Sequence, residues 1–253
     1  MKFSIIVPSF NQELFIDKTL RNLVEIKQKA KDKGVDVEIL VFDSESNSAV
    51  QQEINKYREF FDFVEIKKDK GQYDAINKGI KKVTGDYWTW LNTDDLLNTD
   101  GFFKLTEILK QNNKIDYIYG GVNYIDERGN TTNVYNSYAL DFKTLYSHTP
   151  AIFQPGSFFR KDFTDKIGEL KPYQCCFDYE YILRCFKNNA NIFCCDFVVS
   201  NFRFYKTSKS GSITTIFIKE QLVISENYGR KWFHFLTWFS YLRLIKHFLF
   251  PRK

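Results

Sequence analysis

The sequence lacks the glycine patterns of the commonest nucleotide-binding folds. No Gly-x-Gly-x-x-Gly pattern follows its first apolar run, and no phosphate loop ending in Gly-Lys-Ser or Gly-Lys-Thr occurs in its 253 residues. These absences disfavour a nicotinamide-dependent enzyme and an ordinary ATPase. A secretory signal is also missing, because the apolar segment 3–7 has no basic region before it and no cleavage site after it. We therefore expect a cytoplasmic protein.

Cysteine is scarce, and charge of one sign is not in large excess. The cysteines lack the two-residue gaps of zinc sites, so we expect free, reduced thiols, with a metal or redox role as the alternative. The formal net charge of +5 does not indicate a nucleic-acid-binding protein. Aromatic residues are plentiful, with 26 Phe and 15 Tyr, which points to extensive cores. The five cysteines are Cys175, Cys176, Cys185, Cys194 and Cys195.

Apolar runs alternate with helical patterns along the first half of the chain. Alternating strands and helices with short connections predict an α/β fold with a mostly parallel, doubly wound sheet of Rossmann-like character. Such a sheet binds its ligand outside the carboxyl ends of its strands. The expected strands are 3–7, 37–42, 63–66 and 87–91, and the expected helices are 12–31, 49–60, one that opens near Gln72, and 96–111. Polar segments that share this one rim are 8–11, 43–46, 69–74 and 92–95.

Asp94 and Asp95 directly follow the apolar strand 87–91. Two adjacent carboxylates repel each other unless a cation or hydrogen-bond donors compensate them. Their oxygens suit Mg²⁺ or Mn²⁺, which complete their shells with water and substrate phosphate. The alternative is that one of them caps the helix at 96–111, since Asp is a favoured N-cap. Capping leaves the second carboxylate unexplained, so we favour a cation site.

Asp74 and Asn77 lie three residues apart near the start of the helix that opens at Gln72. On a shared face they could grip a ribose or a phosphate. The alternative is a polar first turn that is stabilised by the helix dipole.

The second half of the chain has a different pattern. We expect a strand at 116–122, a turn at 123–132, a short helix from Leu140, a helix at 163–167 and a strand at 192–199. Gln154 and Gly156 line a bend. Asp178 and Glu180 lie in the first turn of a further helix, where acids usually only offset the helix dipole.

Taken together, these segments resemble the family 2 glycosyltransferases with the GT-A fold over about residues 1–215. The resemblance implies an inverting transfer of a sugar from a nucleotide sugar, most often a UDP-sugar, to an acceptor hydroxyl. The motifs that carry it are Ile5-Ile6-Val7-Pro8-Ser9-Phe10-Asn11, Asp43, Asp69-Lys70-Gly71, Asp74-Ala75, Asn77-Lys78-Gly79, Gly85-Asp86, Leu91-Asn92-Thr93-Asp94-Asp95, Gln154, Asp178-Tyr179-Glu180, Leu183-Arg184 and Asn201-Phe202-Arg203.

The resemblance also implies roles for the matching residues. Asp43 would hold the base of the nucleotide, Asp94 with Asp95 beside it would bind Mn²⁺ or Mg²⁺, and Asp178 would be the general base. Glu180 points elsewhere on its helix and is less suited to be that base. The other expected contacts to the nucleotide sugar are Pro8, Ser9, Asn11, Asp69, Gly71, Asp74, Asn77, Asn92 and Thr93. Expected on the side of the donor sugar and the acceptor are Gln154, Gly156, Glu180 and Arg184.

Two departures from the family pattern keep a second function open. Asn92 stands at the first position of the Asp-x-Asp motif, and Phe153 stands where relatives often carry His before Gln154. A sugar-nucleotide-binding scaffold or regulator without catalysis is therefore the alternative. A nucleotidyltransferase ranks last, because the chain lacks a Gly-rich, basic N-terminal loop for a triphosphate.

Residues 229–253 combine aromatic and basic side chains and contain no Asp or Glu. Charges interrupt this tail too often for a spanning helix of ~20 apolar residues, so we expect an amphipathic helix on a membrane surface. The alternative is docking on the catalytic domain or on a homodimer partner. We predict a catalytic domain at 1–215, divided into a nucleotide-sugar half, 1–111, and an acceptor half, 112–215, and a helical tail at 216–253. The resemblance suggests a lipid-linked glycan acceptor at the inner face of a bacterial plasma membrane.

Overall fold

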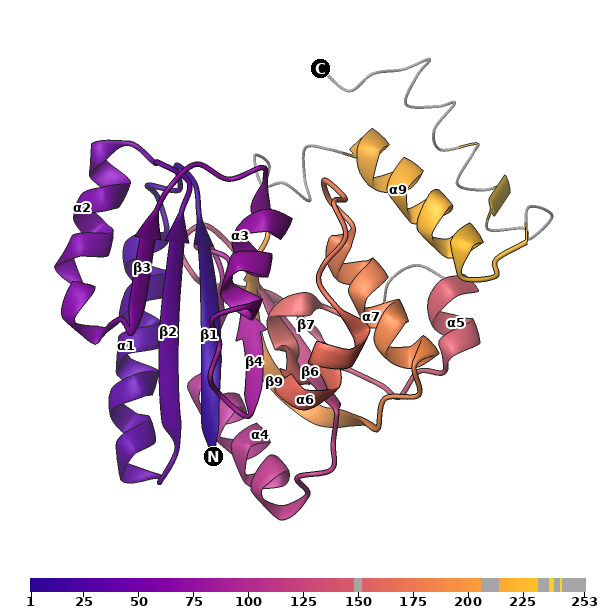
Figure 1. Cartoon of the computed structure of the whole chain (residues 1–253), viewed down its shortest axis with the longest axis horizontal. Helices are drawn as coiled ribbons and strands as arrows, with labels where there is room; N and C mark the ends of the chain where they lie inside the picture. The colour runs from indigo at the N-terminus through magenta and orange to yellow at the C-terminus, as the bar shows by residue number, and fades with distance from the viewer. Residues whose placement is uncertain (148–151, 206–213, 232–236, 239–241, 243–253) are drawn as a thin grey trace.

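The computed structural model describes residues 1–147, 152–205, 214–231, 237–238 and 242. Strands and helices alternate through most of this part of the chain (Figure 1). The strands are β1 Lys2–Ser9, β2 Asp36–Asp43, β3 Phe63–Ile66, β4 Tyr87–Trp90, β5 Leu96–Leu97, β6 Tyr117–Ile125, β7 Thr131–Tyr135, β8 Ser157–Arg160 and β9 Ile192–Arg203. The helices are α1 Ile16–Asp32, α2 Ser48–Lys56, α3 Gln72–Ile80, α4 Thr99–Gln111, α5 Phe142–Ser147, α6 Lys161–Ile167, α7 Phe177–Lys187 and α9 Thr214–Asn227, with short 3₁₀ helices η1 Arg58–Phe60 and η2 Gln154–Gly156.

All described strands belong to one sheet, in the order β3-β2-β1-β4-β8-β6-β9-β5, with β7 paired to β6. The pairs β3-β2, β2-β1, β1-β4 and β6-β9 are parallel, whereas β8, β5 and β7 pair antiparallel with their neighbours. Because β8 runs opposite to both β4 and β6, the strands β1, β2, β4, β6 and β9 all point the same way. Their carboxyl ends therefore meet at one edge of the sheet.

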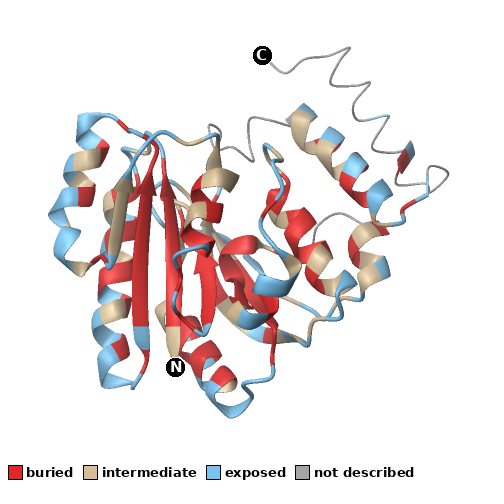
Figure 2. Cartoon of the chain, in the orientation of Figure 1, coloured by how far each residue is buried: buried red, intermediate tan, exposed pale blue. Residues whose placement is uncertain are grey.

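Helices cover both faces of the sheet, as expected for a doubly wound fold. One core joins α1, α2 and α4 to one face of β1 and β2, and the other joins α3 and α7 to the opposite face. Alternate residues of β1 divide between the cores, since Ile5 lies in the first and Ile6 in the second. The central strands are buried on both sides, while the outer faces of the helices are exposed (Figure 2). This explains why β1 and β2 read as nearly continuous apolar runs.

Two helices begin later than the sequence predicts. At α1, Asn11 adopts a positive φ of 48° and bonds to the loop after β2, so the chain turns before the helix starts at Ile16. At α4, Leu96–Leu97 pair with β9 instead of joining the helix. The N-cap is Asn98, whose side chain accepts a hydrogen bond from Gly101 N. The alternative in which Asp94 or Asp95 caps this helix is therefore wrong.

The C-terminal part is described only in pieces. Thr214–Asn227 form α9, which packs beside α5 and α7 (Figure 1). Most of the predicted membrane-associating tail, 229–253, and the polar loop at 206–213 lie outside the described residues. Among the residues that are described, no helix is both long and apolar enough to cross a membrane.

Candidate active site

The loops after β1 and β2 are joined by hydrogen bonds at the carboxyl edge of the sheet. Asp43 is buried, and its two carboxylate oxygens accept from the backbone N (2.9 Å) and hydroxyl (2.5 Å) of Ser46. The Ser46 hydroxyl in turn accepts from Asn11 N at 2.9 Å. The predicted nucleotide-binding residues Asn11 and Asp43 are thus brought into one network.

The loop between β3 and α3 closes on the same network. Asp69 N donates to the Ser44 hydroxyl at 3.0 Å, and Asp69 accepts from Gly71 N at 2.8 Å. Gly71 has a φ of 127°, which favours glycine, and it precedes α3 without giving that helix a side-chain cap. The uncapped N–H groups of a first helical turn attract anions such as phosphate.

A bond from Gln72 Nε2 to Asn92 Oδ1, at 2.5 Å, ties α3 to the loop after β4. Together with the bonds between the earlier loops, it brings all four predicted polar segments to one rim. Pro8 and Thr93 are buried in the same loops, and so is Ser9, whose hydroxyl has no hydrogen-bond partner within the described structure. A buried hydroxyl without a partner costs free energy, so a ligand that bonds to it is stabilised.

Asp94 and Asp95 point in different directions. Asp95 is buried, and its two oxygens accept from Arg203 N (2.9 Å) and Asn92 Nδ2 (3.2 Å). Burial and the neighbouring Asp94 charge raise the pKa of Asp95 well above its usual value. Asp94 is half-buried and accepts from the Tyr205 hydroxyl at 3.0 Å. Both oxygens of Asp95 are therefore engaged within the protein, which the prediction of a metal ligand did not include, whereas Asp94 is half-buried beside Tyr205.

The donor set at Asp94 fits a cation that takes few protein ligands. No group of three or more His, Cys, Asp and Glu side chains converges anywhere in the described ranges. Burial also raises the pKa of Asp94, partly opposed by the bond from Tyr205, so a nearby cation would favour its charged form. Mg²⁺ usually keeps several waters and takes only one or two carboxylates alongside substrate phosphates. A single carboxylate beside a phosphate site suits such an ion.

The first turn of α7 meets the end of β4. The Phe177 ring lies 6.2 Å from the Trp90 ring, between centroids, and Asp178 follows as a half-buried residue. Gln154 Nε2 donates to the Trp90 carbonyl at 2.7 Å. Gly156 is buried where a Cβ would lie 2.9 Å from the Gly120 carbonyl, so it allows close packing on β6. These contacts bring Gln154 and the element that carries Asp178 to the strand that delivers Asp94.

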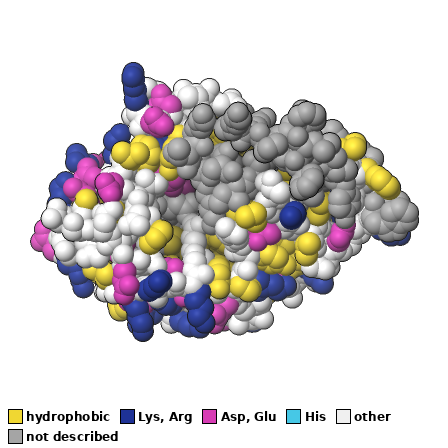
Figure 3. Space-filling view, turned by 90° about the horizontal axis from the view of Figure 1, so that it is seen from above, with side chains coloured by type: hydrophobic (Ala, Val, Ile, Leu, Met, Phe, Trp, Pro, Cys, Tyr) yellow, Lys and Arg dark blue, Asp and Glu magenta, His cyan; other side chains and the backbone are white. Residues whose placement is uncertain are grey.

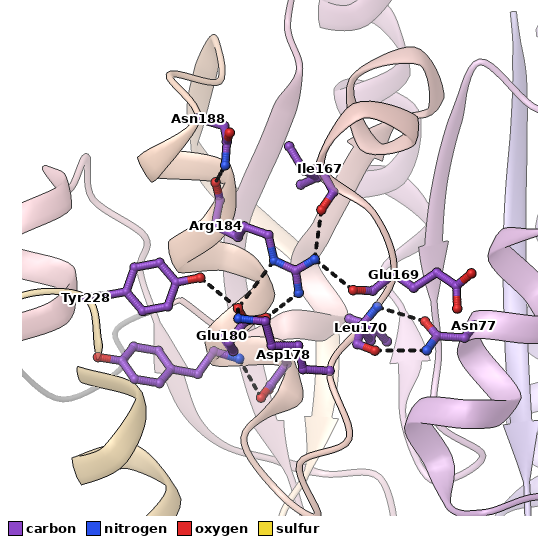
Figure 4. A network of polar contacts seen from close by, with 11 residues as sticks. Asn77, Ile167, Glu169, Leu170, Asp178, Glu180, Arg184, Asn188 and Tyr228 are labelled. Carbon is purple, nitrogen blue, oxygen red and sulfur yellow. Dashed lines mark hydrogen bonds and ion pairs between the residues drawn. The ribbon is translucent and has the colours of Figure 1, made fainter. Parts of the chain in front are cut away.

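The Glu180 and Arg184 side chains bond to each other and to other groups of the protein. The Glu180 side chain is fully buried and pairs with Arg184, with Lys171 at 2.8 Å and with the Tyr228 hydroxyl at 2.7 Å (Figure 4). Arg184 also donates to the carbonyls of Ile167 and Glu169. Burial alone would raise the pKa of Glu180, but these donors outweigh it and lower the pKa. Contrary to the prediction, neither side chain is free to line a sugar site.

Asn77 is likewise directed at the protein. Its amide donates to the Leu170 carbonyl at 2.9 Å and accepts from Leu170 N at 2.8 Å (Figure 4). Asp74, by contrast, is half-buried and accepts from Lys70 N at 3.2 Å, in the loop that faces the rim. Of the predicted pair, Asp74 therefore lies at the rim, whereas Asn77 holds the segment before α7 through Leu170.

Sequence reasoning assigned no role to two residues at the rim, although Arg203 lies in one of the quoted motifs. Tyr205, just after β9, accepts from Gln12 Nε2 at 2.8 Å and donates to Asp94. Arg203 is buried and donates to the carbonyls of Asp94 and Asp126, which fixes the loop after β4. The available signal was that Arg203 ends, and Tyr205 follows, a strand whose carboxyl end lies at the same edge. Figure 3 views the molecule from above relative to Figure 1, and basic and acidic side chains are interspersed over the described surface there.

Sequence comparison identifies relatives. A glycosyltransferase of Rickettsia conorii is 30% identical over 131 residues, which is 51% of this chain and 20% of the relative. Poly-beta-1,6-N-acetyl-D-glucosamine synthase of Staphylococcus aureus is 26% identical over 119 residues, which is 46% of this chain and 27% of the synthase. The chain thus spans about a quarter of the length of these relatives or less.

Solved structures share the fold. Staphylococcus aureus TarS 1-349 in complex with UDP-GlcNAc superposes with a TM-score of 0.64 at 17% identity, covering 100% of this chain and 74% of TarS. A mannosyltransferase from Pyrobaculum calidifontis in complex with GDP-Man and Mn²⁺ gives 0.62 at 14% identity, covering 98% and 72%. The predicted GT-A fold is confirmed. The sequence model of glycosyl transferase family 2 matches residues 4–168, more than half of the chain, and the protein belongs to that family.

Proposed function

We propose that the protein is an inverting glycosyltransferase that moves a sugar from a nucleotide sugar, with UDP as the nucleotide, to a hydroxyl of a glycan acceptor. The observation that carries this proposal is the contact between the end of β4 and the start of α7. The Trp90–Phe177 packing holds the first turn of α7, which bears Asp178, against the end of the strand whose following loop bears Asp94. A carboxylate for the diphosphate side and a carboxylate for the acceptor side are the two groups that the reaction needs.

The nucleotide would lie on the loops after β1, β2 and β3. Asp43 and Asn11 form one hydrogen-bonded network there, and the Ser9 hydroxyl has no hydrogen-bond partner among the described residues. The start of α3 after Gly71 has no side-chain cap, so the partial positive charge of this helix end would favour the diphosphate. UDP-GlcNAc in TarS and GDP-Man in the mannosyltransferase support a nucleotide-sugar donor.

Asp94 would hold Mn²⁺ or Mg²⁺ together with the donor's phosphates. The bound ion would neutralise charge on the departing diphosphate. The Tyr205 hydroxyl, which donates to Asp94, orients this carboxylate, and Arg203 holds its backbone. The Mn²⁺ in the related mannosyltransferase structure supports this assignment.

Asp178 would accept the proton of the acceptor hydroxyl as that oxygen attacks the sugar. A positioned general base contributes typically ~10²–10⁴-fold. The neighbouring Glu180 is excluded from this task because its carboxylate is buried among Arg184, Lys171 and Tyr228.

The acceptor would be a glycan, lipid-linked, in bacterial surface polysaccharide synthesis. Support comes from the similarity to poly-beta-1,6-N-acetyl-D-glucosamine synthase. We assign residues 112–215 to the acceptor side and the basic, aromatic segment 229–253 to the inner surface of the plasma membrane, where such an acceptor would be held.

A thermal-shift screen tests the proposal. UDP-sugars and GDP-mannose are added with and without Mn²⁺ to the wild type, to Asp94→Ala, and to Asp100→Ala as an exposed control. A ligand at 100 times its Kd stabilises by about 2.7 kcal/mol, which shifts Tm by roughly 5–10 °C in a chain of this size. We expect a metal-dependent shift that Asp94→Ala loses and the control keeps. UDP release on adding glycan acceptors then separates an enzyme from a binding scaffold. No shift with any nucleotide sugar would contradict the proposal.

A further inference from the structure

One carboxylate of α9 receives three successive backbone N–H groups from the segment before α7. Glu220 Oε1 accepts from Gln174 N at 2.7 Å, and Glu220 Oε2 accepts from Cys175 N at 2.8 Å and from Cys176 N at 2.9 Å. Three consecutive N–H groups directed at one anion form a nest, which binds negative charge through its aligned dipoles. Here another helix of the same chain supplies that negative charge.

This contact lies at the N-terminal end of α7, just before its first turn. Cys176 occupies the N-cap position, and its side chain makes no capping hydrogen bond. The N-terminus of a helix carries partial positive charge and N–H groups that have no partner within the helix. Glu220 therefore anchors the three residues that lead into α7, the last of which is two residues before Asp178.

A second contact holds the same turn from the other end of α9. The Tyr228 hydroxyl donates to Glu180 Oε1 at 2.7 Å, inside the buried network with Arg184 (Figure 4). The Phe217 carbonyl also accepts from the Cys176 thiol at 3.6 Å. The first turn of α7 is thus held by α9 on both sides of Asp178. Both α7 and α9 lie beyond residues 4–168, which the family model matches.

We propose that Glu220 is the positioning residue for Asp178, which makes α9 part of the catalytic unit. The inference rests on the proposed function, because Asp178 is the base only in that reaction. A general base must lie within hydrogen-bond reach of the proton that it accepts, so a looser turn lowers its efficiency. The hydrogen bonds of the loops after β1, β2 and β3 described above join these loops to one another and to the loop after β4 rather than to α9, so donor affinity should not depend on Glu220.

Steady-state kinetics of Glu220→Ala and Glu220→Gln test this role. Glu226, exposed on the same helix, supplies the matched control Glu226→Gln. We expect Glu220→Ala to lower kcat at least tenfold while the donor KM stays within twofold of the wild type. Glu220→Gln keeps one acceptor oxygen without the charge, and its kcat should lie between those of Glu220→Ala and the wild type. It also keeps the test valid if Glu220→Ala fails to fold.

The outcomes separate this inference from the proposed function. A wild type that transfers no sugar removes both. An active wild type with unchanged kcat in the folded Glu220 variants overturns only the positioning role. A fall in kcat accompanied by an equal loss of donor binding also overturns it, because that result indicates general unfolding. Tyr228→Phe, which removes only the hydroxyl, should lower kcat by less than Glu220→Ala.

Discussion

The loop after β4 and the first turn of α7 each carry two acids, and each divides them in the same way. One acid of each pair is buried and bonded within the protein, namely Asp95 and Glu180. The other is half-buried, namely Asp94 and Asp178. Proximity of two carboxylates in sequence therefore does not indicate that both act on a ligand.

The two buried acids differ in what compensates their charge. Asp95 accepts from a backbone N–H and an amide, and its pKa is raised because burial and Asp94 disfavour the anion. Glu180 accepts from two cationic side chains and a tyrosine, and its pKa is lowered despite burial. At Asp95 burial and the Asp94 charge outweigh the hydrogen bonds, whereas at Glu180 the hydrogen bonds from Arg184, Lys171 and Tyr228 outweigh burial.

The largest expected effect separates the two acids of α7. Asp178→Asn should lower transfer by ~10²–10⁴-fold, because the amide cannot accept the hydroxyl proton. Its melting temperature and its affinity for the nucleotide sugar should remain those of the wild type, as measured by thermal shift and titration. Full activity in Asp178→Asn would show that neither Asp178 nor Glu180 is the general base.

The next effect concerns the buried member of that pair. Glu180→Gln should destabilise the fold by about 3–5 kcal/mol in urea unfolding, since removing one partner of a buried ion pair leaves the other uncompensated. Lys171→Ala is the control, because the Lys171 side chain is 53% exposed and such pairs contribute about 0–1 kcal/mol. If Glu180→Gln and Lys171→Ala lose the same free energy of unfolding, the buried contact between Glu180 and Arg184 does not have the dominant role.

Asn77 allows a similar comparison at the rim. Asn77→Ala should cost about 1–3 kcal/mol, because Leu170 N and the Leu170 carbonyl lose their partner inside the protein. Isothermal titration should give an unchanged Kd for the nucleotide sugar. Weaker binding of the nucleotide sugar by Asn77→Ala at unchanged stability would instead indicate that Asn77 contacts the ligand.

The smallest effect is a pH dependence. Because the folded-state pKa of Glu180 lies below its ordinary value of 4.5, its stabilisation is complete above that pH and is lost as pH falls through the folded-state pKa. The urea midpoints of the wild type and of Glu180→Gln should therefore converge below pH 4.5. If the difference between the two urea midpoints stays constant down to pH 3, the charge of Glu180 is not the source of its stabilising effect.

The sequence predicted β1, β2, β3, β4, β6 and β9 but not β5, β7 and β8. β1 and β2 are buried on both faces, so their apolar runs were sufficient to identify them. β5 has two residues and resembles the start of a helix, whereas β7 is exposed throughout and shows no alternation of buried positions. The order of the strands also could not be predicted, because it depends on pairing between distant segments.

At the candidate site, the sequence predicted which loops share the rim but not which way each side chain points. The loops follow parallel strands, and this alone brings them together. The directions of Asp95 and Glu180 depend on Arg203 and Tyr228, which are 108 and 48 residues away in the chain. No local pattern records such partners.

The position of β9 between β6 and β5 has a consequence for synthesis on the ribosome. Its last residue, Arg203, pairs with Ile125 and bonds to Asp95, so the sheet cannot be completed until that residue has been translated. At typical elongation rates, the interval between β6 and the end of β9 lasts roughly 4–16 s. During this time one edge of the nascent β6 has no partner strand, which makes this stage of translation the one at which chaperones would matter most.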